Sequence, residues 1–373
     1  MPRRRGRPRR RRGPRRGGPP PQPGARAGAL VDVTAGEALE LVGGLLVDAG
    51  VPRERAAAVA RVVVVAEAWG IASHGLQRVP TYVDRTLAGG HPPDAELVVV
   101  RDTGPLLTLD GGGGLGHWQV AHAVAEAVPR ARRYGVALVA VGDSGHCGAL
   151  GVYAADVAAA GLVGLVLSCG PAAMAPWGGA RPLLSTSPVA GGLPTSGGHA
   201  VVDMALSTVA RGTVARYARE GRPLPEGWAL DAQGRPTADP AAALHGMLAP
   251  LGGAKGSALA FLVEALTAGL VGPSLSADVA DFFDPAAHGR RQGIAHTVLV
   301  VDPAATDGRG DPAGARRRLD DLAARTVEAG GRVPGARRSR PDDLDPAAPL
   351  AVDGALWREL LARRGAAPAG RRR

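Results

Sequence analysis

The sequence predicts an α/β protein of two domains. Its 373 residues are long for one hydrophobic core, and 45% of them are apolar, which is enough to fill two. Apolar strand patterns also alternate with helical patterns through the middle of the chain. Aromatic residues make up only 3% of the sequence, so the cores must be built from Val, Leu and Ala.

The first part of the globular sequence predicts helices. Thr34-Ala35-Gly36-Glu37 has the spacing of a capping box and opens a helix that ends at Gly50. Pro52 suits the first turn of a second helix. After the loop from Gly70 to Gly75, a third helix is predicted from Leu76 to Leu87.

Strands and helices then alternate. In chain order we predict strands at 96–101 and 105–110, a helix at 117–134, a strand at 136–141, a helix at 150–160 and a strand at 163–167. Residues 171–203, rich in Gly, Pro, Ser and Thr, predict strands and functional loops. The last predicted elements are a helix at 207–220, an irregular hairpin at 221–240, a helix from Lys255 to 270, a strand within 289–301, and helices at 316–329 and 355–363.

The positive charge is concentrated at the N-terminus. The formal net charge is +10, but residues 1–28 carry 11 arginines and no acid, which leaves −1 for everything after Gly28. A segment of Arg, Pro and Gly cannot bury apolar surface, so residues 1–28 are predicted to be disordered. They fit a basic arm for polyanions, a targeting segment or a translation start placed too far upstream. We favour the last, because a globular pattern begins abruptly near Leu30.

The two cysteines indicate a reducing compartment. Cys147 and Cys169 form no C-x-x-C pair, so neither a disulfide framework nor a metal site is expected. The chain also lacks a secretory h-region and any stretch of about 18 apolar residues that could span a membrane. A cytoplasmic location fits best.

The glycine-rich segment from Gly111 to Gly116 satisfies G-x-G-x-x-G between a predicted strand and a helix, as a Rossmann dinucleotide loop would. Glycine, however, makes up 55 of 373 residues, so such matches arise easily. The following acid, Asp143, lies 27 residues past the last glycine rather than about 20. We interpret the segment as a turn that leads into a helix.

Lys255, in Gly252-Gly253-Ala254-Lys255-Gly256, is the only lysine among 44 basic residues. A compact ammonium group can point three donors at a ribose or phosphate in a narrow, glycine-walled slot, which a planar guanidinium cannot do. The alternative is a chance survivor on a solvated surface.

Two histidines stand in patterns that suit acid–base chemistry. His74 and Arg78 are four residues apart, so a helix would place both near one face. Arginine can bind a carboxylate bidentately while histidine exchanges a proton with the neighbouring oxygen. The alternative is a capping histidine beside a surface arginine. A second histidine, His146, lies in a glycine-flanked loop directly after a buried strand.

Six motifs follow one another along the chain. They are Gly70 to Arg78, Ser144 to Gly148, Pro176-Trp177-Gly178-Gly179, Asp203-Met204-Ala205, Gly253-Ala254-Lys255-Gly256 and Val333-Pro334-Gly335. With these motifs the chain, from about Val31 to Arg363, resembles the malate/L-lactate dehydrogenase-like family of NAD(P)-dependent oxidoreductases. That family also includes ureidoglycolate dehydrogenase, diketogulonate reductase, sulfolactate dehydrogenase and the cyclic imine reductases.

The resemblance implies a fold other than the Rossmann fold. It implies a cofactor domain on a largely antiparallel sheet, a helical and mixed domain from the N- and C-terminal segments, and a homodimer with the active site between domains. We therefore expect a tail at 1–28, an N-terminal domain at 29–110, an NAD(P)-binding domain at 111–290 and a segment at 291–373 that returns to the first domain.

The resemblance also implies residue roles. His74 or His146 would be the proton donor and acceptor, and Arg78 would bind the substrate carboxylate. Contacts with NAD or NADP would come from Ser144, Ser168, Asp203, Met204, Ala205, Lys255 and Gly335.

The chain departs from the family pattern at a few positions. Asp143 and Ser187 replace customary asparagines, and Ser257-Ala258 replaces Tyr-Gly. Neither Asp nor Ser offers the two-donor amide of asparagine, so these changes bear on the substrate more than on the reaction class.

The sequence thus predicts a dehydrogenase that passes a hydride between NAD or NADP and C2 of a small 2-oxo or 2-hydroxy acid. One alternative is a cyclic imine reductase acting on a pyrroline or piperideine carboxylate. Another, from a different class, is a nucleic-acid-binding protein acting through the basic tail. Nucleic acid is not the expected partner, because the basicity belongs to that tail.

Overall fold

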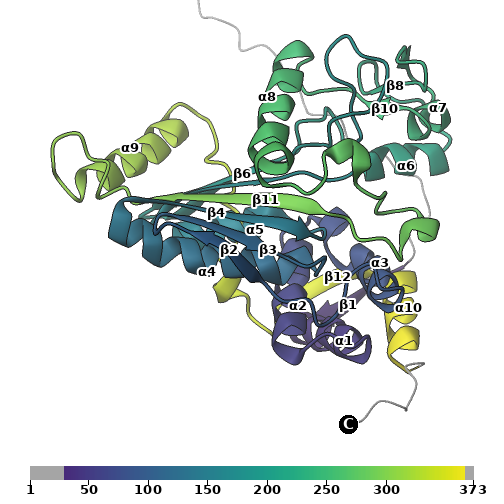
Figure 1. The fold of residues 1–373 in the computed structure, drawn as a ribbon, viewed down its shortest axis with the longest axis horizontal. Coiled ribbons are helices and arrows are strands. Elements are labelled where there is room, and N and C mark those ends of the chain that lie inside the picture. Colours follow the sequence, from purple (N-terminus) through teal and green to yellow (C-terminus); the bar gives the residue numbers. More distant parts are fainter. Residues whose placement is uncertain (1–28, 366–373) are drawn as a thin grey trace, which may run out of the picture.

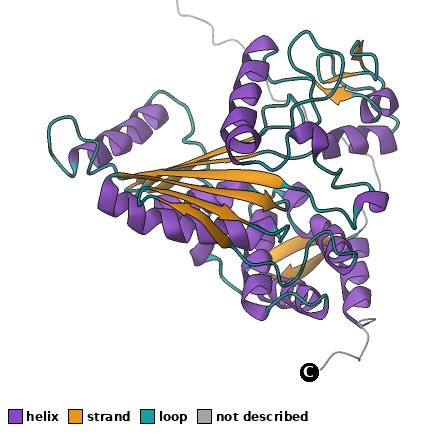
Figure 2. Cartoon of the chain, viewed as in Figure 1, coloured by secondary structure: helices purple, strands orange, loops and turns teal. Residues whose placement is uncertain are grey.

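The computed structural model describes residues 29–365. The predictions for residues 1–28 fall outside this range. Within it, helices cover a central sheet on both faces, which confirms the predicted α/β class (Figures 1 and 2).

A seven-stranded mixed sheet forms the centre of the molecule, in the order β2-β3-β4-β11-β5-β6-β7. β3 and β4 are parallel, and the other neighbouring pairs of this sheet are antiparallel. The late strand β11 lies between β4 and β5. The strands are β2 (Val98–Asp102), β3 (Leu106–Asp110), β4 (Val136–Ser144), β5 (Val163–Ser168), β6 (Val189–Thr195), β7 (Gly198–Met204) and β11 (Ile294–Val301).

Alternating side chains give the sheet two buried faces. Val166 of β5 packs on the face covered by α4 (Gly116–Tyr134) and α5 (Leu150–Ala159), whereas Leu167 packs on the opposite face. In Figure 1, α4 lies below the sheet and α8 lies above it. The elements on the upper side are α6 (Arg211–Arg219), α7 (Pro240–Leu244), α8 (Ala254–Glu264), which continues into a π turn (Ala265–Gly269), and the small sheet of β8 (Ala229–Leu230), β9 (Pro236–Thr237) and β10 (Met247–Leu248).

The N- and C-terminal segments share a third core. β1 (Leu30–Thr34) pairs antiparallel with β12 (Pro349–Asp353), so the two ends of the described chain lie side by side. Around this pair pack α1 (Ala35–Asp48), α2 (Arg53–Ala68), α3 (Val79–Leu87) and α10 (Gly354–Gly365). A further helix, α9 (Gly314–Glu328), projects beyond the sheet (Figure 1).

Most predicted elements are present, with shifted ends. The capping box is confirmed, because the Glu37 N–H donates to the Thr34 hydroxyl and the Thr34 N–H donates to the Glu37 carboxylate. The helix predicted from Ser207 begins only at Arg211, because Ser207 pairs with Pro250 in a β-bridge. The sheet also crosses the sequence boundaries drawn at 110 and 290, since β2 and β3 precede the first and β11 follows the second.

In the glycine-rich segment between β3 and α4, the N–H groups of Gly111 to Gly114 donate hydrogen bonds inside the protein. Gly111 donates to Gly142, Gly113 to Asp143, Gly114 to Gly111, and Gly112 to the Asp110 carboxylate. A dinucleotide loop needs free backbone N–H groups to bind phosphate. This segment therefore acts as a turn that leads into α4.

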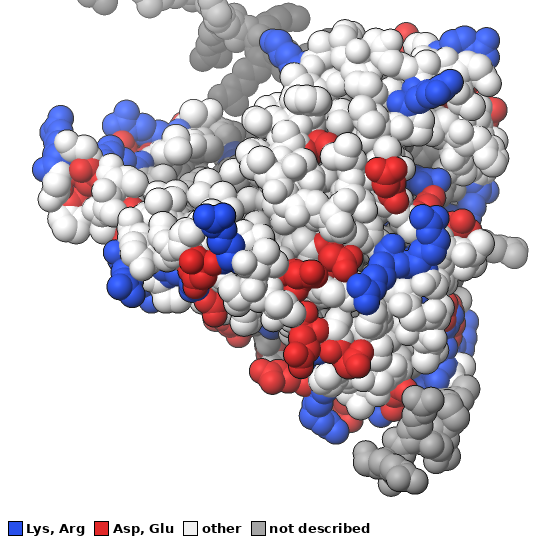
Figure 3. All heavy atoms as spheres, in the orientation of Figure 1, with Lys and Arg blue, Asp and Glu red and all other residues white. Residues whose placement is uncertain are grey.

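The surface of the described chain carries charge of both signs. Figure 3 shows basic and acidic side chains interspersed on the face seen in Figure 1. Within residues 29–365, no helix has the length and apolar character required to cross a bilayer. The same residues contain no cluster of three or more His, Cys, Asp or Glu side chains suited to a metal ion.

Candidate active site

His74 and Arg78 lie in two successive 3₁₀ turns (Ala72–His74 and Leu76–Arg78) rather than on a helix. Glu67 of α2 shapes the corner between them, because its carboxylate accepts the Leu76 N–H at 2.8 Å. A Cβ atom on Gly75 would collide with that carboxylate, which explains the glycine. The corner therefore turns His74 and Arg78 toward the same space.

The imidazole of His74 is neutral at pH 7. Burial, followed by the charge of Arg78, lowers its pKa to about 4. Its Nδ1 lies 2.9 Å from the Ser73 hydroxyl. Because a serine hydroxyl can donate or accept, either tautomer of His74 is supported, and its Nε2 can present a proton or a lone pair.

His146, in the loop after β4, stacks near His74, with ring centroids 5.7 Å apart and an interplanar angle of 20°. Its Nδ1 accepts the Gly148 N–H at 3.2 Å and lies 2.8 Å from the Tyr82 hydroxyl. Since a backbone N–H can only donate, Nδ1 carries no proton and Nε2 carries it. Burial lowers the pKa of His146 well below its usual value. His146 is therefore a neutral hydrogen-bond donor.

Three further aromatic side chains lie next to the pair of His74 and His146: Tyr82, His117 and Phe282. Tyr82 and Phe282 pack against His146, and the His117 ring meets Tyr82 edge-on at 4.6 Å. We did not predict any of the three. Tyr82 follows Arg78 by four residues, so the same spacing argument could have found it. Phe282 lies far along the chain, and no local signal points to it.

Arg78 is held by its Nε atom and by an aromatic ring, which leaves its two Nη groups available. Its Nε donates to the Ser73 carbonyl at 2.7 Å, and its guanidinium carbon lies 4.6 Å from the centroid of the Phe283 ring. Within residues 29–365 its two Nη groups make no hydrogen bond. A guanidinium fixed in this way can bind a carboxylate bidentately.

Ser144 and Ser168 are joined by His296, which belongs to none of the sequence motifs. The Ser144 hydroxyl donates to Gln119 at 2.6 Å. His296 donates from Nε2 to the Gly145 carbonyl at 3.1 Å, which leaves Nδ1 as an acceptor 2.9 Å from the Ser168 hydroxyl. All of these side chains are buried, so both serine hydroxyls are engaged inside the protein.

The other predicted cofactor residues gather around β7. Asp203, at its end, accepts the Gly151 N–H in the first turn of α5 at 3.0 Å, and burial raises the pKa of its carboxyl. The Gly335 loop packs on the same strand, because the Val201 N–H donates to Pro334 at 2.9 Å. Gly335 has a φ of 71°, and a Cβ there would lie 2.7 Å from the Val201 carbonyl oxygen, which explains the glycine.

Lys255 lies exposed in the first turn of α8. Its loop runs beside the chain that follows Ala205, because the Leu251 N–H donates to Leu206 at 2.8 Å. The Pro-Trp-Gly-Gly loop joins it, since the Trp177 N–H donates to the Ser257 hydroxyl at 2.9 Å. Three separate motifs therefore meet around β7 and the segment after it.

The residues around β7 fit a polar ligand such as a nicotinamide dinucleotide. Both ring nitrogens of His199 on β7, and Nη1 of Arg338 just after the Gly335 loop, are buried without a hydrogen-bond partner in the described chain. Buried polar atoms are normally satisfied by protein, water or ligand. These atoms supply donors and acceptors of the kind that such a molecule needs.

Comparison with known sequences decides the family. The sequence model of the malate/L-lactate dehydrogenase family matches residues 33–361, nearly all of the described chain. The chain belongs to this family. The resemblance inferred from the six motifs is thereby confirmed.

Individual relatives agree with this assignment. (2R)-3-Sulfolactate dehydrogenase (NADP(+)) of Chromohalobacter salexigens is 44% identical over 256 residues, which cover 68% of this chain and 76% of the relative. Δ(1)-Pyrroline-2-carboxylate reductase of Ancylobacter novellus is 35% identical over 319 residues, 85% of this chain and 93% of the relative. The structure of sulfolactate dehydrogenase from Methanocaldococcus jannaschii superposes with a TM-score of 0.80 at 28% identity, covering 90% of this chain and 97% of that one.

The family membership confirms the predicted enzyme class. This malate/L-lactate dehydrogenase family member is an NAD(P)-dependent oxidoreductase that exchanges a hydride with a small 2-hydroxy or 2-oxo acid, and cyclic imine reductases stand among its relatives. The matched residues 33–361 contain the globular part, so that part is an enzyme and not an inert attachment to the basic tail.

Proposed function

We propose that His74 is the proton donor and acceptor in hydride transfer to and from C2 of the substrate. The hydrogen bonds of the two histidines carry this assignment. The Gly148 N–H occupies Nδ1 of His146 and holds that ring in one tautomer. Nδ1 of His74 faces the Ser73 hydroxyl, which can reverse its hydrogen bond. His74 is thus the histidine that can serve both directions of the reaction.

The remaining groups then take complementary roles. The free Nη groups of Arg78 would bind the substrate carboxylate, which would place the C2 oxygen next to both histidines. When bound, the nicotinamide cofactor supplies or accepts the hydride. His74 exchanges the proton with the C2 oxygen, and Nε2 of His146 donates a hydrogen bond to the same atom. The buried ring of Phe282 helps to exclude water.

Substrate binding would also prepare His74 for proton donation. The charge of Arg78 is one of the two causes that lower the pKa of His74. A carboxylate on Arg78 would offset that charge and raise the pKa of His74. Protonation of His74 is therefore coupled to the arrival of the oxo acid.

The cofactor would lie on a domain unlike a Rossmann domain, with the N- and C-terminal segments forming a second domain. The largely antiparallel sheet, the separate core around β1 and β12, and the engaged N–H groups of Gly111 to Gly114 support this division. Asp203, Met204, Ala205, Lys255 and Gly335 would hold the nucleotide, with Ser144 and Ser168 supporting the inner end of the site.

A second cation near Arg78 favours a substrate with two anionic groups. The guanidinium of Arg211 lies 5.9 Å from the centroid of Phe283, the same ring that Arg78 covers at 4.6 Å. Its ion pair with Asp281 is 3.1 Å long, and the two side chains are 40% and 37% exposed, so the pair is weak enough to yield to a ligand. A sulfonate or second carboxylate beside Arg211 agrees with the sulfolactate dehydrogenases among the relatives.

The cyclic imine reductase activity is the second candidate, because the pyrroline carboxylate reductase aligns with the larger share of this chain, 85%. Initial rates with sulfopyruvate, oxaloacetate, pyruvate and Δ1-pyrroline-2-carboxylate, each with NADPH and NADH, separate the two. We expect the highest kcat/KM with a dianionic oxo acid. Arg211→Met should lower that value about tenfold through the loss of a charged hydrogen bond, and leave pyruvate unchanged. A higher kcat/KM with the cyclic imine would establish the second candidate.

We also propose that the enzyme is a cytoplasmic homodimer. Leu259, Phe261 and Leu262 on α8 are 52%, 65% and 51% exposed, and such a group of apolar side chains is typical of a subunit contact. Cys147 and Cys169 are both free and buried, as suits a reducing compartment.

A further inference from the structure

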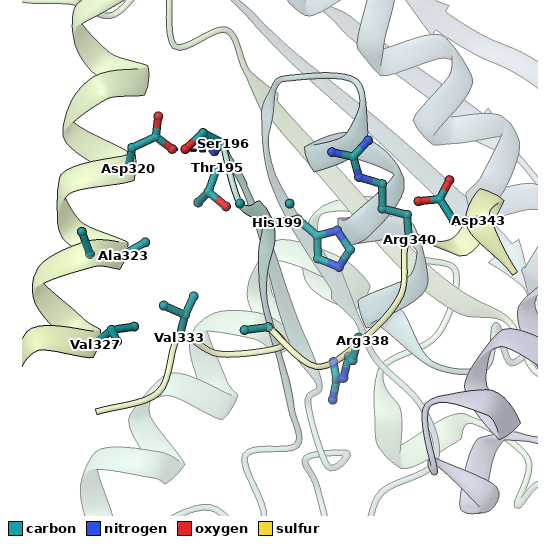
Figure 4. Close-up of a pocket in the computed structure, with 14 residues that line it drawn as sticks. Thr195, Ser196, His199, Asp320, Ala323, Val327, Val333, Arg338, Arg340 and Asp343 are labelled. Atoms are coloured by element: carbon teal, nitrogen blue, oxygen red, sulfur yellow. Dashed lines mark hydrogen bonds between the residues drawn. The ribbon is translucent and has the colours of Figure 1, made fainter. Parts of the chain in front are cut away.

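A cavity of about 540 Å³ opens beside the proposed cofactor residues. It lies between the turn that joins β6 to β7, helix α9 and the segment 333–343 (Figure 4). Known small-molecule sites have volumes of about 300–1,000 Å³. The catalytic side chains His74, Arg78 and His146 do not line it. The cavity instead borders the start of β7, the strand that contains Asp203, and the loop that contains Gly335.

One wall of this cavity is apolar and the other is basic. Ala323 and Val327 of α9, with Val333, form the apolar wall on the left of Figure 4. His199 and Arg340 lie across the cavity from them. Such a pair of walls suits a flat heterocycle that carries an anionic substituent.

The basic wall contains buried donors without partners. His199 is only 6% exposed, and neither of its ring nitrogens forms a hydrogen bond in the described chain. Nη1 of Arg338 is also buried without a hydrogen-bond partner there. The guanidinium group of Arg338 lies over the Trp69 ring, with its carbon 5.1 Å from the ring centroid. Burial lowers the pKa of His199, and the charges of Arg340 and Arg338 lower it further, so both guanidinium groups act on this ring.

The lining also contains two acids, on opposite sides of the cavity. Asp320 accepts the Ser196 N–H at 2.6 Å on the far side of the cavity. Asp343 lies beside Arg340 and is the other acid in the lining. On this side of the cavity the two guanidinium groups of Arg338 and Arg340 outnumber the one carboxylate.

We propose that this cavity binds the adenosine end of the cofactor, and that His199, Arg338 and Arg340 hold a 2′-phosphate there. The enzyme would then prefer NADPH to NADH. This inference rests on the proposed function, because it takes the cofactor to lie along β7 and the Gly335 loop. A dianionic phosphate satisfies the unpartnered donors, whereas the 2′-hydroxyl of NADH leaves most of them without an acceptor.

Calorimetric titration of the full chain with 2′,5′-ADP and with 5′-AMP tests the pocket directly, without catalysis. We expect 2′,5′-ADP to bind at least tenfold more tightly. Arg340→Ala, at an exposed position, should weaken 2′,5′-ADP binding about tenfold, as expected for one charged hydrogen bond, and leave 5′-AMP binding unchanged. Arg338→Met, which keeps an apolar stem over Trp69, should do the same.

Arg337→Ala is the matched control, because Arg337 is an exposed neighbour outside the cavity lining. Equal affinities for the two nucleotides, or an equal loss in the control, would overturn the inference. Fluorescence titration with NADPH and NADH separates this failure from a failure of the proposed function. If neither dinucleotide binds, the proposed function fails. If NADH binds and turns over as well as NADPH, only the 2′-phosphate assignment fails.

Discussion

His74 and His146 are chemically alike, and the different roles that we propose for them rest on their neighbours. A backbone N–H on Nδ1 holds His146 as a donor, whereas a hydroxyl on Nδ1 leaves His74 able to change tautomer. The motif around each histidine is visible in the sequence, but the atoms that meet each Nδ1 are not.

Substitution by glutamine should separate the two histidines. His74→Gln should lower kcat by about 10²–10⁴, the usual contribution of a general acid or base, while the affinity for NADPH changes little. His146→Gln keeps an N–H donor and should lower kcat by less. Steady-state rates in both directions measure this. A larger loss in the His146 variant would indicate that His146, and not His74, is the proton donor and acceptor.

The pH dependence should differ between the two directions. Reduction needs protonated His74, whose pKa in the free enzyme is about 4, so kcat/KM for reduction should fall about tenfold per pH unit above pH 5. Oxidation needs neutral His74, so its kcat/KM should stay level from pH 8 to 5 and fall only as the pH approaches 4. Profiles in both directions check this. A reduction profile that is flat between pH 5 and 8 would be inconsistent with His74 as the donor.

The two positions where asparagine is customary share a backbone feature. Asp143 and Ser187 are the two non-glycine residues with positive φ in the described chain, at 42° and 44°. Asparagine and aspartate adopt this region more readily than other side chains. The family asparagine is therefore explained by the backbone as well as by its amide group, and serine at 187 is the more strained of the two replacements.

At the scale of elements, the predicted alternation of strands and helices largely agrees with the structure. Strong periodicity and glycine ends locate α4, β4, α5 and β5 to within a few residues. We did not predict β1 and β12. Each has five residues and is a strand only because it pairs with the other across most of the chain.

Glycine 192 fixes the distance between β6 and α5. A Cβ on Gly192 would collide with the Ala154 carbonyl oxygen, whereas one on Gly191 would meet only the Gly164 carbonyl oxygen at 3.9 Å. Gly192→Ala should therefore destabilise the protein by about 1–3 kcal/mol, the usual cost of overpacking. Gly191→Ala, one residue away in the same strand, is the matched control and should change the free energy of unfolding by less than about 0.5 kcal/mol. Denaturant unfolding compares the two, and equal losses would exclude this close contact.

At the scale of the whole molecule, the two ends of the described residues 29–365 pair with each other, and the central sheet is completed by a late strand. β11 enters the middle of the sheet only after almost 300 residues, and β12 returns to β1. The proposed active site takes His74 and Arg78 from the N-terminal core, His146 from the loop after β4 and Phe282 from the segment before β11. Completion of the site therefore depends on the folding of nearly the whole chain.

The exposed apolar face of α8 predicts a dimer. Light scattering should give a mass near twice the 37.7 kDa of the chain. Phe261→Asp, at a position 65% exposed, should shift the protein toward the monomer. Leu322→Asp, at a position 60% exposed on α9, is the matched control and should not. A mass near 37.7 kDa for the unmodified chain would contradict the dimer.

The sequence by itself determined the α/β class and the enzyme family, and it predicted His74, Arg78 and His146 as site residues. These follow from local spacing and motif order, which are properties of the chain and need no contact between distant segments. Only the tertiary structure decided how Tyr82 meets His146, 64 residues away, and how His296 meets Ser168, 128 residues away. It also decided that His199 and Arg340 share a cavity. Tautomers, pKa values and pocket charges depend on atoms brought together by packing, and no periodicity in the sequence records those distances.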